Sequence, residues 1–198
     1  MVELELCRAL RAFIEEAVKS LQLPVEPHVP IEPLPVDPPG EEREDDEDID
    51  AGMMTDGMTD EVPQFAEYAQ CRTPKVFNGY LPPKHQDDDA HESDDFPFIV
   101  VRPDEATSTR ESTMVTVSII FGAYSASSDG YEHCLNMASR VRQALMSMPF
   151  LTLDGRYQLR DEITWRNTAE QPWPFWQVDM TTHWLIISPQ PVSGVEDL

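Results

Sequence analysis

Between residues 112 and 148 the alternation of apolar and polar positions changes its period once. The first part has a period of two, which is typical of a strand with one buried face, and the second has the period of an amphipathic helix. The strand positions are Val115, Val117, Ile119 and Phe121, and the helix positions are Tyr131, Cys134, Leu135, Ala138, Val141, Leu145 and Met148. Asp129 is the expected N-cap, Glu132 completes a capping box, and Pro149 is expected to end the helix.

Another amphipathic helix is predicted over residues 2–23, with Pro24 ending it. Its apolar stripe consists of Leu6, Cys7, Leu10, Phe13, Ile14, Ala17, Val18 and Leu21. We expect this stripe to pack on the sheet of its own domain. The alternative is that it docks on a neighbouring subunit.

Two segments before residue 112 have the pattern of strands. Residues 73–82 predict a short extended segment with a turn signal at Asn78-Gly79. Residues 96–102 are apolar on both faces, which indicates a strand covered on both sides. The polar residues 103–111 predict a connection.

The strongest hairpin signal is Asp154-Gly155, with strands predicted at 150–153 and from residue 156 onward. The strand after the turn places Tyr157, Leu159, Ile163 and Trp165 on one face. The last strand, 175–187, places Trp176, Val178, Met180, Thr182, Trp184 and Ile186 inward and Gln177, Asp179, Thr181 and His183 outward.

These elements predict an α+β fold: a single domain with a largely antiparallel or mixed β-sheet flanked by two main helices. A long acidic disordered insertion is expected to interrupt it. The expected parts are an N-terminal helix (1–23), a Pro-rich and acidic insertion (24–72), an α+β core (73–191) and a C-terminal tail (192–198).

Charge sets the insertion apart from the rest of the chain. The formal net charge is -23, and much of it, like much of the 18 prolines, falls between Pro24 and Asp95. Prolines at almost every third position of 24–37 favour an extended path, and the acidic run that follows is expected to stay mobile. A calcium loop is the sharper alternative for 38–62, but the ligand spacing of a calcium loop is missing.

The same charge excludes some classes of function. Few Lys and Arg are present to neutralise phosphates, so tight nucleic-acid binding is not expected. The three cysteines, Cys7, Cys71 and Cys134, have no disulfide or zinc spacing and are expected to be reduced and mostly buried. Without a signal peptide or an apolar run of roughly 20 residues, a protein made in a reducing cytoplasm and not inserted in a membrane is predicted.

No catalytic, cofactor or metal motif is found, so an enzyme is not predicted and no cofactor is expected. His133 and Cys134 are neighbours, but adjacent helix positions point about 100° apart, and Cys134 lies on the apolar stripe. His85 and His91, with carboxylates between them, match no metal-binding spacing and are interpreted as solvated loop residues.

Aromatic residues are dense near the C-terminus. They are Trp165, Trp173, Phe175, Trp176 and Trp184. Trp173 lies between two prolines and is either a rigid lid on the core or an anchor at a protein interface, where Trp often carries binding energy. Trp173, Phe175 and Trp176 are the candidate interface residues.

Several short segments occur in an order that resembles a known family. They are Pro74-Lys75-Val76-Phe77-Asn78-Gly79-Tyr80-Leu81-Pro82, Asp95 to Pro103, Gly122-Ala123-Tyr124-Ser125 with Asp129-Gly130-Tyr131, Glu170 to Trp176, and Met180-Thr181-Thr182-His183-Trp184. In these segments the chain resembles tail terminator (tail completion, head-tail joining) proteins of tailed bacteriophages. The resemblance covers residues 73–191 and the first helix, whereas the acidic insertion departs from compact members of the family.

The resemblance implies a structural virion protein that forms a ring, usually of six subunits, at the head-proximal end of the tail tube. Its partners would be its own copies, the tail tube protein and the head-side connector, and genomic DNA would pass through without specific binding. It would be made in the cytoplasm of the host bacterium and reside in the virion. The net charge suggests an acidic lumen or loop, with Asp87, Asp88, Asp89, Asp94 and Asp95 as candidates.

Two other functions stay open. A head-closure or neck protein on the other side of the same joint is the nearest alternative. An acidic module that mimics nucleic acid and occupies a basic partner is the more distant one.

Overall fold

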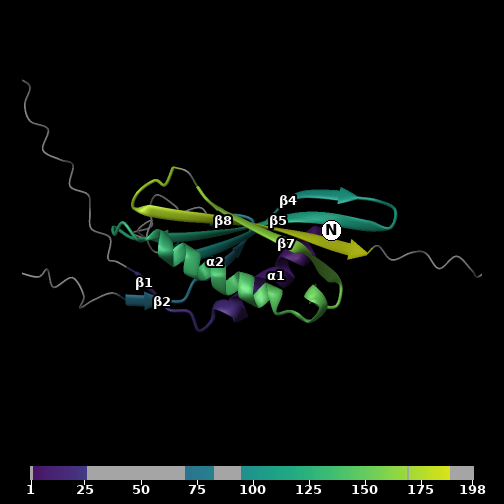
Figure 1. Ribbon diagram of the computed structural model, residues 1–198, viewed down its shortest axis with the longest axis horizontal. Helices are drawn as coiled ribbons and strands as arrows, with labels where there is room; N and C mark the ends of the chain where they lie inside the picture. Colours follow the sequence, from purple (N-terminus) through teal and green to yellow (C-terminus); the bar gives the residue numbers. More distant parts are fainter. Residues whose placement is uncertain (1, 26–69, 83–94, 169, 188–198) are drawn as a thin grey trace, which may run out of the picture. The chain divides into compact units, whose positions relative to one another are not determined.

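A computed structural model of the chain describes residues 2–25, 70–82, 95–168 and 170–187. These residues form an α+β domain in which helices α1 (Val2–Val18) and α2 (Tyr131–Met146) lie on one face of a six-stranded mixed sheet (Figure 1). The predicted fold class is confirmed. The strands are β1 (Leu23–Val25), β2 (Gln70–Arg72), β3 (Lys75–Asn78), β4 (Phe98–Ser108), β5 (Ser112–Tyr124), β6 (Thr152–Leu153), β7 (Tyr157–Asn167) and β8 (Phe175–Ile187).

The order of strands in the large sheet is β3-β4-β5-β8-β7-β6. Only β3 and β4 are parallel, and the other neighbours are antiparallel. A separate two-stranded sheet joins β1 to β2, with Pro24 opposite Cys71. Residue 25 and residue 70 are therefore Cα partners, so the chain leaves the described domain and returns to it at the same place.

The central pair β5 and β8 forms the middle of the core. Val115, Val117, Ile119 and Phe121 are completely buried, as their alternation predicts. On β8 the predicted inward set is also buried, except for Trp176, which is partly exposed. Phe98 to Val101 of β4 are all buried, which confirms a strand covered on both faces.

Helix α1 packs on its own domain. Leu6, Leu10, Ile14 and Val18 are completely buried and join the same hydrophobic core as β3, β4 and α2. The helix ends at Val18, before the predicted Pro24, and Arg140 of α2 donates from Nε to the carbonyl oxygen of Ala17 (3.1 Å). A carbonyl in the last turn has no partner inside its own helix, so this cation replaces one.

We expect Arg140→Ala to lower the free energy of unfolding by about 1 kcal/mol, because a carbonyl at the α1 C-terminus loses a charged donor. Urea denaturation followed by far-UV circular dichroism measures the change. Arg142→Ala, two positions further along α2, is the control, and an equal loss in both variants would show that the bond from Arg140 to Ala17 contributes no stability of its own.

The predicted connection at residues 103–111 is wrong, because β4 continues to Ser108. Its register shifts between Pro103 and Glu105, and β3 pairs only with Phe98 to Val101. Beyond Val101 this makes β4 an edge strand, where a proline and a bulge are tolerated. The polar composition here is that of an exposed edge, and the turn itself is confined to residues 109–111.

The predicted N-cap is also wrong. Gly130, in a helical conformation, precedes α2 without a side-chain cap. The Asp129 carboxylate instead accepts a hydrogen bond from Ser127 Oγ, which lowers the pKa of Asp129. A Cβ on Gly130 would lie 2.3 Å from Nε1 of Trp176, so the helix begins where a tryptophan ring leaves room for glycine alone.

The Asp154-Gly155 hairpin is confirmed, with positive φ at both residues and Leu153 opposite Tyr157. The strand predicted from residue 150 begins only at Thr152. Residues 149–151 form a 3-10 turn, and Phe150, with a φ of 54°, is 92% exposed.

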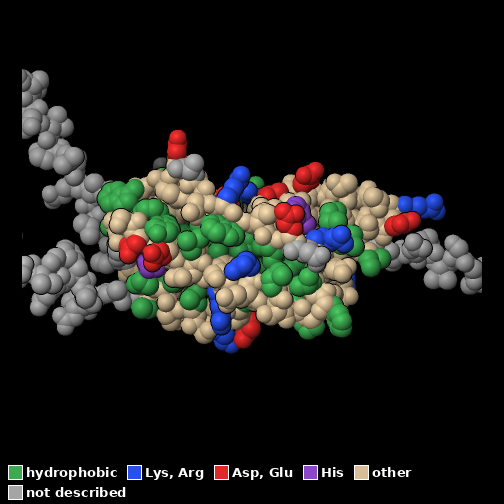
Figure 2. Space-filling model, viewed as in Figure 1, with side chains coloured by type: hydrophobic (Ala, Val, Ile, Leu, Met, Phe, Trp, Pro, Cys, Tyr) green, Lys and Arg blue, Asp and Glu red, His purple; other side chains and the backbone are tan. Residues whose placement is uncertain are grey.

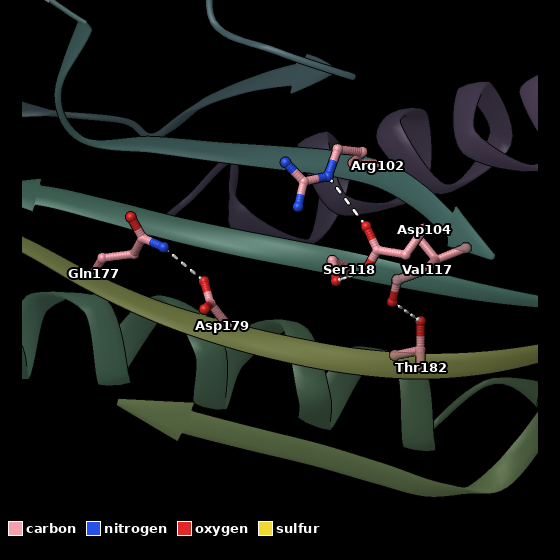
Figure 3. Close-up of polar contacts among 7 residues, drawn as sticks. All are labelled: Arg102, Asp104, Val117, Ser118, Gln177, Asp179 and Thr182. Atoms are coloured by element: carbon pink, nitrogen blue, oxygen red, sulfur yellow. Dashed lines mark hydrogen bonds and ion pairs between the residues drawn. The ribbon is translucent and has the colours of Figure 1, made fainter. Parts of the chain in front are cut away.

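The sheet face opposite the helices is polar along β4, β5 and β8 (Figure 3). Arg102 donates to Asp104 (3.1 Å), whose carboxylate also accepts from Ser118, and Gln177 Nε2 donates to Asp179 (2.8 Å). The outward positions predicted on β8, Gln177, Asp179, Thr181 and His183, are all partly exposed. Apart from Phe98 and Val100, which are buried on it, this face is wet along these strands, whereas the helix face forms the core.

Candidate functional site: the aromatic end of the sheet

Four segments that are distant in the sequence meet where β4, α2 and β8 begin and β5 ends. The ring of Phe96 packs at a tilt against those of Phe98 and Phe175, with centroids 5.0 and 5.4 Å apart. Tyr124 completes this aromatic cluster, since its centroid lies 5.5 Å from that of Phe175 in an edge-on arrangement. Such pairs add about 0.5–1.5 kcal/mol each beyond the area that they bury.

The loop before β8 is held by the amide of Gln171. Its Nε2 donates to the carbonyl oxygens of Thr168 (3.0 Å) and Gln177 (2.8 Å), and its Oε1 accepts from the backbone N–H of Gln177 (2.7 Å). The backbone N–H of Ser125 donates to the Pro174 carbonyl (3.1 Å) and ties the loop to the end of β5. The Gln171 side chain thus gives the loop backbone the hydrogen bonds that a neighbouring strand would give it in a sheet.

This frame presents Trp173 to solvent. The side chain is 55% exposed, although its Nε1 donates to the carbonyl of Ala126 (3.3 Å). Trp176, three residues further along, lies near Tyr131, which is 39% exposed: their ring centroids are 6.2 Å apart. The Nε1 of Trp176 donates to the Ser125 carbonyl (2.9 Å). We call residues 126–131 and 170–173 the Trp173 surface.

The Trp173 surface is acidic. Asp129, Glu132 and Glu170 are exposed on or next to it, and the segments 122–139 and 170–178 contain no Lys or Arg. A large aromatic side chain is thus held in place and half exposed, with acidic residues near it, and such side chains often carry binding energy at protein interfaces.

The predicted site residues fall into two groups. Trp173 is exposed, while Phe175 and Trp176 are partly buried as its support. An interface role for these three residues stays a prediction. Asp87, Asp88, Asp89 and Asp94, like His85 and His91, lie outside the described residues, as does most of the predicted insertion. Asp95, which precedes Phe96, is partly buried.

A shallow apolar groove of about 210 Å³ lies between α2 and strands β7 and β8. Its lining consists of Leu135, Ala138, Ser139, Arg142, Trp165 and Met180. Trp165 is opposite Met180 in the sheet and on the predicted face, yet it is 50% exposed. The sequence placed these apolar residues in the core, and no signal in it indicates that the end of β7 is left half uncovered.

The three thiols are not alike. Cys7 and Cys134 are buried and Cys71 is exposed, so two of the three fit the prediction. Cys134 donates from Sγ to the carbonyl of Trp176 (3.3 Å), and burial raises the pKa of its thiol to about 12. Burial, with the charge of Glu3 adding to it, raises the pKa of Cys7 to about 11. Both thiols are unreactive in the fold, which argues against a nucleophile at Cys134.

We expect a thiol reagent at pH 8 to modify Cys71 alone in the native protein, and all three cysteines after unfolding.

The pKa values of the Cys7 and Cys134 thiols are higher in the folded protein than the ordinary value of 9.0. The stability that these thiols contribute is therefore complete below about pH 9 and is lost as the pH rises through about 11 to 12. The urea midpoint measured against pH should therefore fall in this window, and less steeply in a Cys7→Ala, Cys134→Ala double variant.

No protein-family model and no curated protein matches this chain. Among the residues that the structure describes, none of the helices has the length and apolar character needed to cross a membrane. In the same ranges, no three His, Cys, Asp or Glu side chains are grouped so that they could hold a metal ion.

Proposed function

We propose that this chain is a structural protein of a tailed-bacteriophage virion, a tail terminator. Its copies would form a ring, expected to be hexameric, at the head-proximal end of the tail tube. The ring would end polymerisation of the tube protein and join the tail to the head-side connector. Genomic DNA would pass through it without specific binding.

The observation that carries this proposal is the convergence of four of the five segments that resemble the family. The fifth, Met180 to Trp184, lies in the middle of β8, opposite Val115 to Ile119 of β5. Residues 95–103, 122–125, 129–131 and 170–176 together build the aromatic end of the sheet and the Trp173 surface. Residues 74–82 lie beside them, since the backbone N–H of Lys75 donates to the Pro97 carbonyl (3.0 Å). A set of short patterns that packs into one place supports a shared function better than the same patterns scattered over a fold.

The charge distribution favours a conduit whose acidic groups come from outside the described ranges. Within those ranges Lys and Arg are nearly as numerous as Asp and Glu, and only Arg43 and Lys84 fall elsewhere. The acidic segments 26–69 and 83–94 would therefore supply a negative lumen that repels phosphate. A ring structure with these segments on its outer rim would contradict the proposal of an acidic lumen, but not the proposal of a ring.

Native mass spectrometry over a concentration series, with negative-stain images of the same samples, tests the proposal. Closed rings of about six copies would support it. If the protein stays monomeric, the deciding test is its binding to purified tail tubes: attachment at one end of each tube supports a terminator. Binding to head-side connectors without binding to tubes would favour a neck protein instead.

The same charge distribution keeps an acidic binding module as a second candidate. Because residues 25 and 70 are Cα partners in the β1–β2 pair, a two-residue Asn-Gly turn can replace residues 26–69 with little change to the domain. A terminator should still fold and form rings after this deletion. A nucleic-acid mimic should lose its ability to compete with DNA for a DNA-binding protein.

A further inference from the structure

The chain carries two exposed surfaces of opposite charge, one with a projecting side chain and the other with a groove. One is the Trp173 surface, where a fixed indole projects from acidic surroundings. The other is the groove between α2 and β7, which is apolar and has Arg142 in its lining. Figure 2 shows hydrophobic side chains along the middle of the face on which α2 lies, with Lys or Arg side chains beside them.

We propose that Trp173 of one copy seats in the α2–β7 groove of a second copy. This inference rests on the proposed function, because it names the contact by which the ring is built. The knob and the groove lie on different parts of one copy, so the contact is head-to-tail, and a head-to-tail contact closes into a ring when its rotation allows.

The groove has the size and chemistry for an indole. A buried apolar cavity of about 150 Å³ is enough to bind benzene, and this groove measures about 210 Å³. Leu135, which is partly exposed, offers apolar contacts, and the half-exposed ring of Trp165 offers an aromatic partner. Ala138 and Met180 are buried parts of the lining. The Arg142 guanidinium can lie over the indole face of the incoming side chain.

Charge sets the direction of the contact. Asp129, Glu132 and Glu170 around Trp173 would approach Arg142, the cation in the lining of the groove. Opposite charges at the rim of an interface speed the encounter of the right surfaces and disfavour the wrong ones. Trp173 cannot fill the groove of its own copy while its Nε1 is bonded to the Ala126 carbonyl.

The loop is also prepared for binding. The three hydrogen bonds of the Gln171 amide and the bond from Ser125 to Pro174 fix the backbone on both sides of Trp173. A side chain that is already ordered loses less entropy when it binds, which is why fixed aromatic residues dominate interface energies.

Two variants test the contact in the full chain. Trp173→Ala and Ser139→Trp, which fills the groove from α2, should each raise the concentration needed for half assembly by at least about 30-fold. Phe150→Ala is the matched control, because Phe150 is 92% exposed but belongs to neither surface, and it should leave assembly unchanged. The opposite ranking, with Phe150→Ala disrupting assembly and Trp173→Ala sparing it, overturns the contact.

Photo-crosslinking identifies the partner residues. Benzoylphenylalanine in place of Trp173, with one copy in two isotopically labelled, should give inter-copy adducts on residues 135–142, Trp165 or Met180. If rings form but the adducts lie on another surface, the proposed contact is wrong and the proposed ring is still supported. If the sample contains only dimers and the adducts lie on the groove, the proposed contact is supported and the proposed ring is wrong. If the protein remains monomeric both in solution and on tail tubes, both proposals are wrong.

Discussion

Replacing Trp184 with alanine is expected to lower the free energy of unfolding by about 3–5 kcal/mol. Trp184 is completely buried in β8, between Val115 of β5 and Leu159 of β7. Its Nε1 donates to Thr182 Oγ1 (2.9 Å), which in turn donates to the carbonyl of Val117 (3.1 Å; Figure 3). Alanine would leave a cavity in the middle of the sheet and remove the indole from this buried chain of hydrogen bonds.

Since small domains are stable by only about 5–15 kcal/mol, the Trp184→Ala variant should be near the limit of folding at 37 °C. Guanidinium denaturation followed by far-UV circular dichroism measures the loss. Trp173→Ala removes the same side chain from a half-exposed site and is expected to cost less than about 1 kcal/mol. Equal losses in the two variants would contradict the burial described for Trp184.

A Thr182→Val variant separates the hydrogen bonds from the packing. The volume of the side chain is kept, but the buried Nε1 of Trp184 loses its acceptor, which costs about 1–3 kcal/mol. Trp184→Ala should therefore be the more harmful of the two, because it removes both.

The second large effect is expected at Gly122. A Cβ at this position would lie 2.2 Å from the Cζ atom of Phe98, its cross-strand partner, so Gly122→Ala forces the ring out of the aromatic cluster. We expect a loss of about 1–3 kcal/mol, as is typical of overpacking. Urea denaturation gives the stability, and near-UV circular dichroism reports the displaced aromatic rings.

A second substitution distinguishes this clash from a change in backbone entropy. Phe98→Leu shortens the side chain that the new methyl would meet. The Gly122→Ala, Phe98→Leu double variant should therefore be more stable than the sum of the two single effects, by about 0.5–3 kcal/mol. Simple additivity would mean that Phe98 does not confine residue 122.

Predictions from the sequence were reliable for elements in which one apolar face determines how the element packs. The alternation in β5 and β8 and the stripe of α1 named the buried residues, because burying an apolar face is the main driving force of folding. The Asp154-Gly155 signal located the hairpin, because few residues adopt positive φ without cost. Local chemistry was less reliable: Asp129 bonds to Ser127 instead of capping α2, and the polar residues after Pro103 form an edge of the sheet rather than a loop.

The candidate site depends on facts that periodicity does not contain. Trp165 and Trp184 have the same inward phase in their strands, yet one is half exposed and the other completely buried. Phe150 was assigned to a strand and projects into solvent at a 3-10 turn. In each case the difference lies in which element happens to cover the residue, and that is set by the lengths and positions of elements far away in the chain.

By itself the sequence determined the α+β class, the inward faces of the central strands and of α1, and the separation of the acidic segments from the apolar ones. For α2 it named most of the buried face, but Tyr131 of the predicted stripe is 39% exposed and the buried Met137 was missed. These follow from local rules, since the phase of a side chain is set by the period of its own backbone. Only the tertiary structure decided that four distant segments form one aromatic end, that Gln171 fixes Trp173 in a half-exposed position, and that α2 leaves a groove beside β7. Contacts between residues far apart in sequence depend on how the elements pack together, and a single chain read in order does not carry that information.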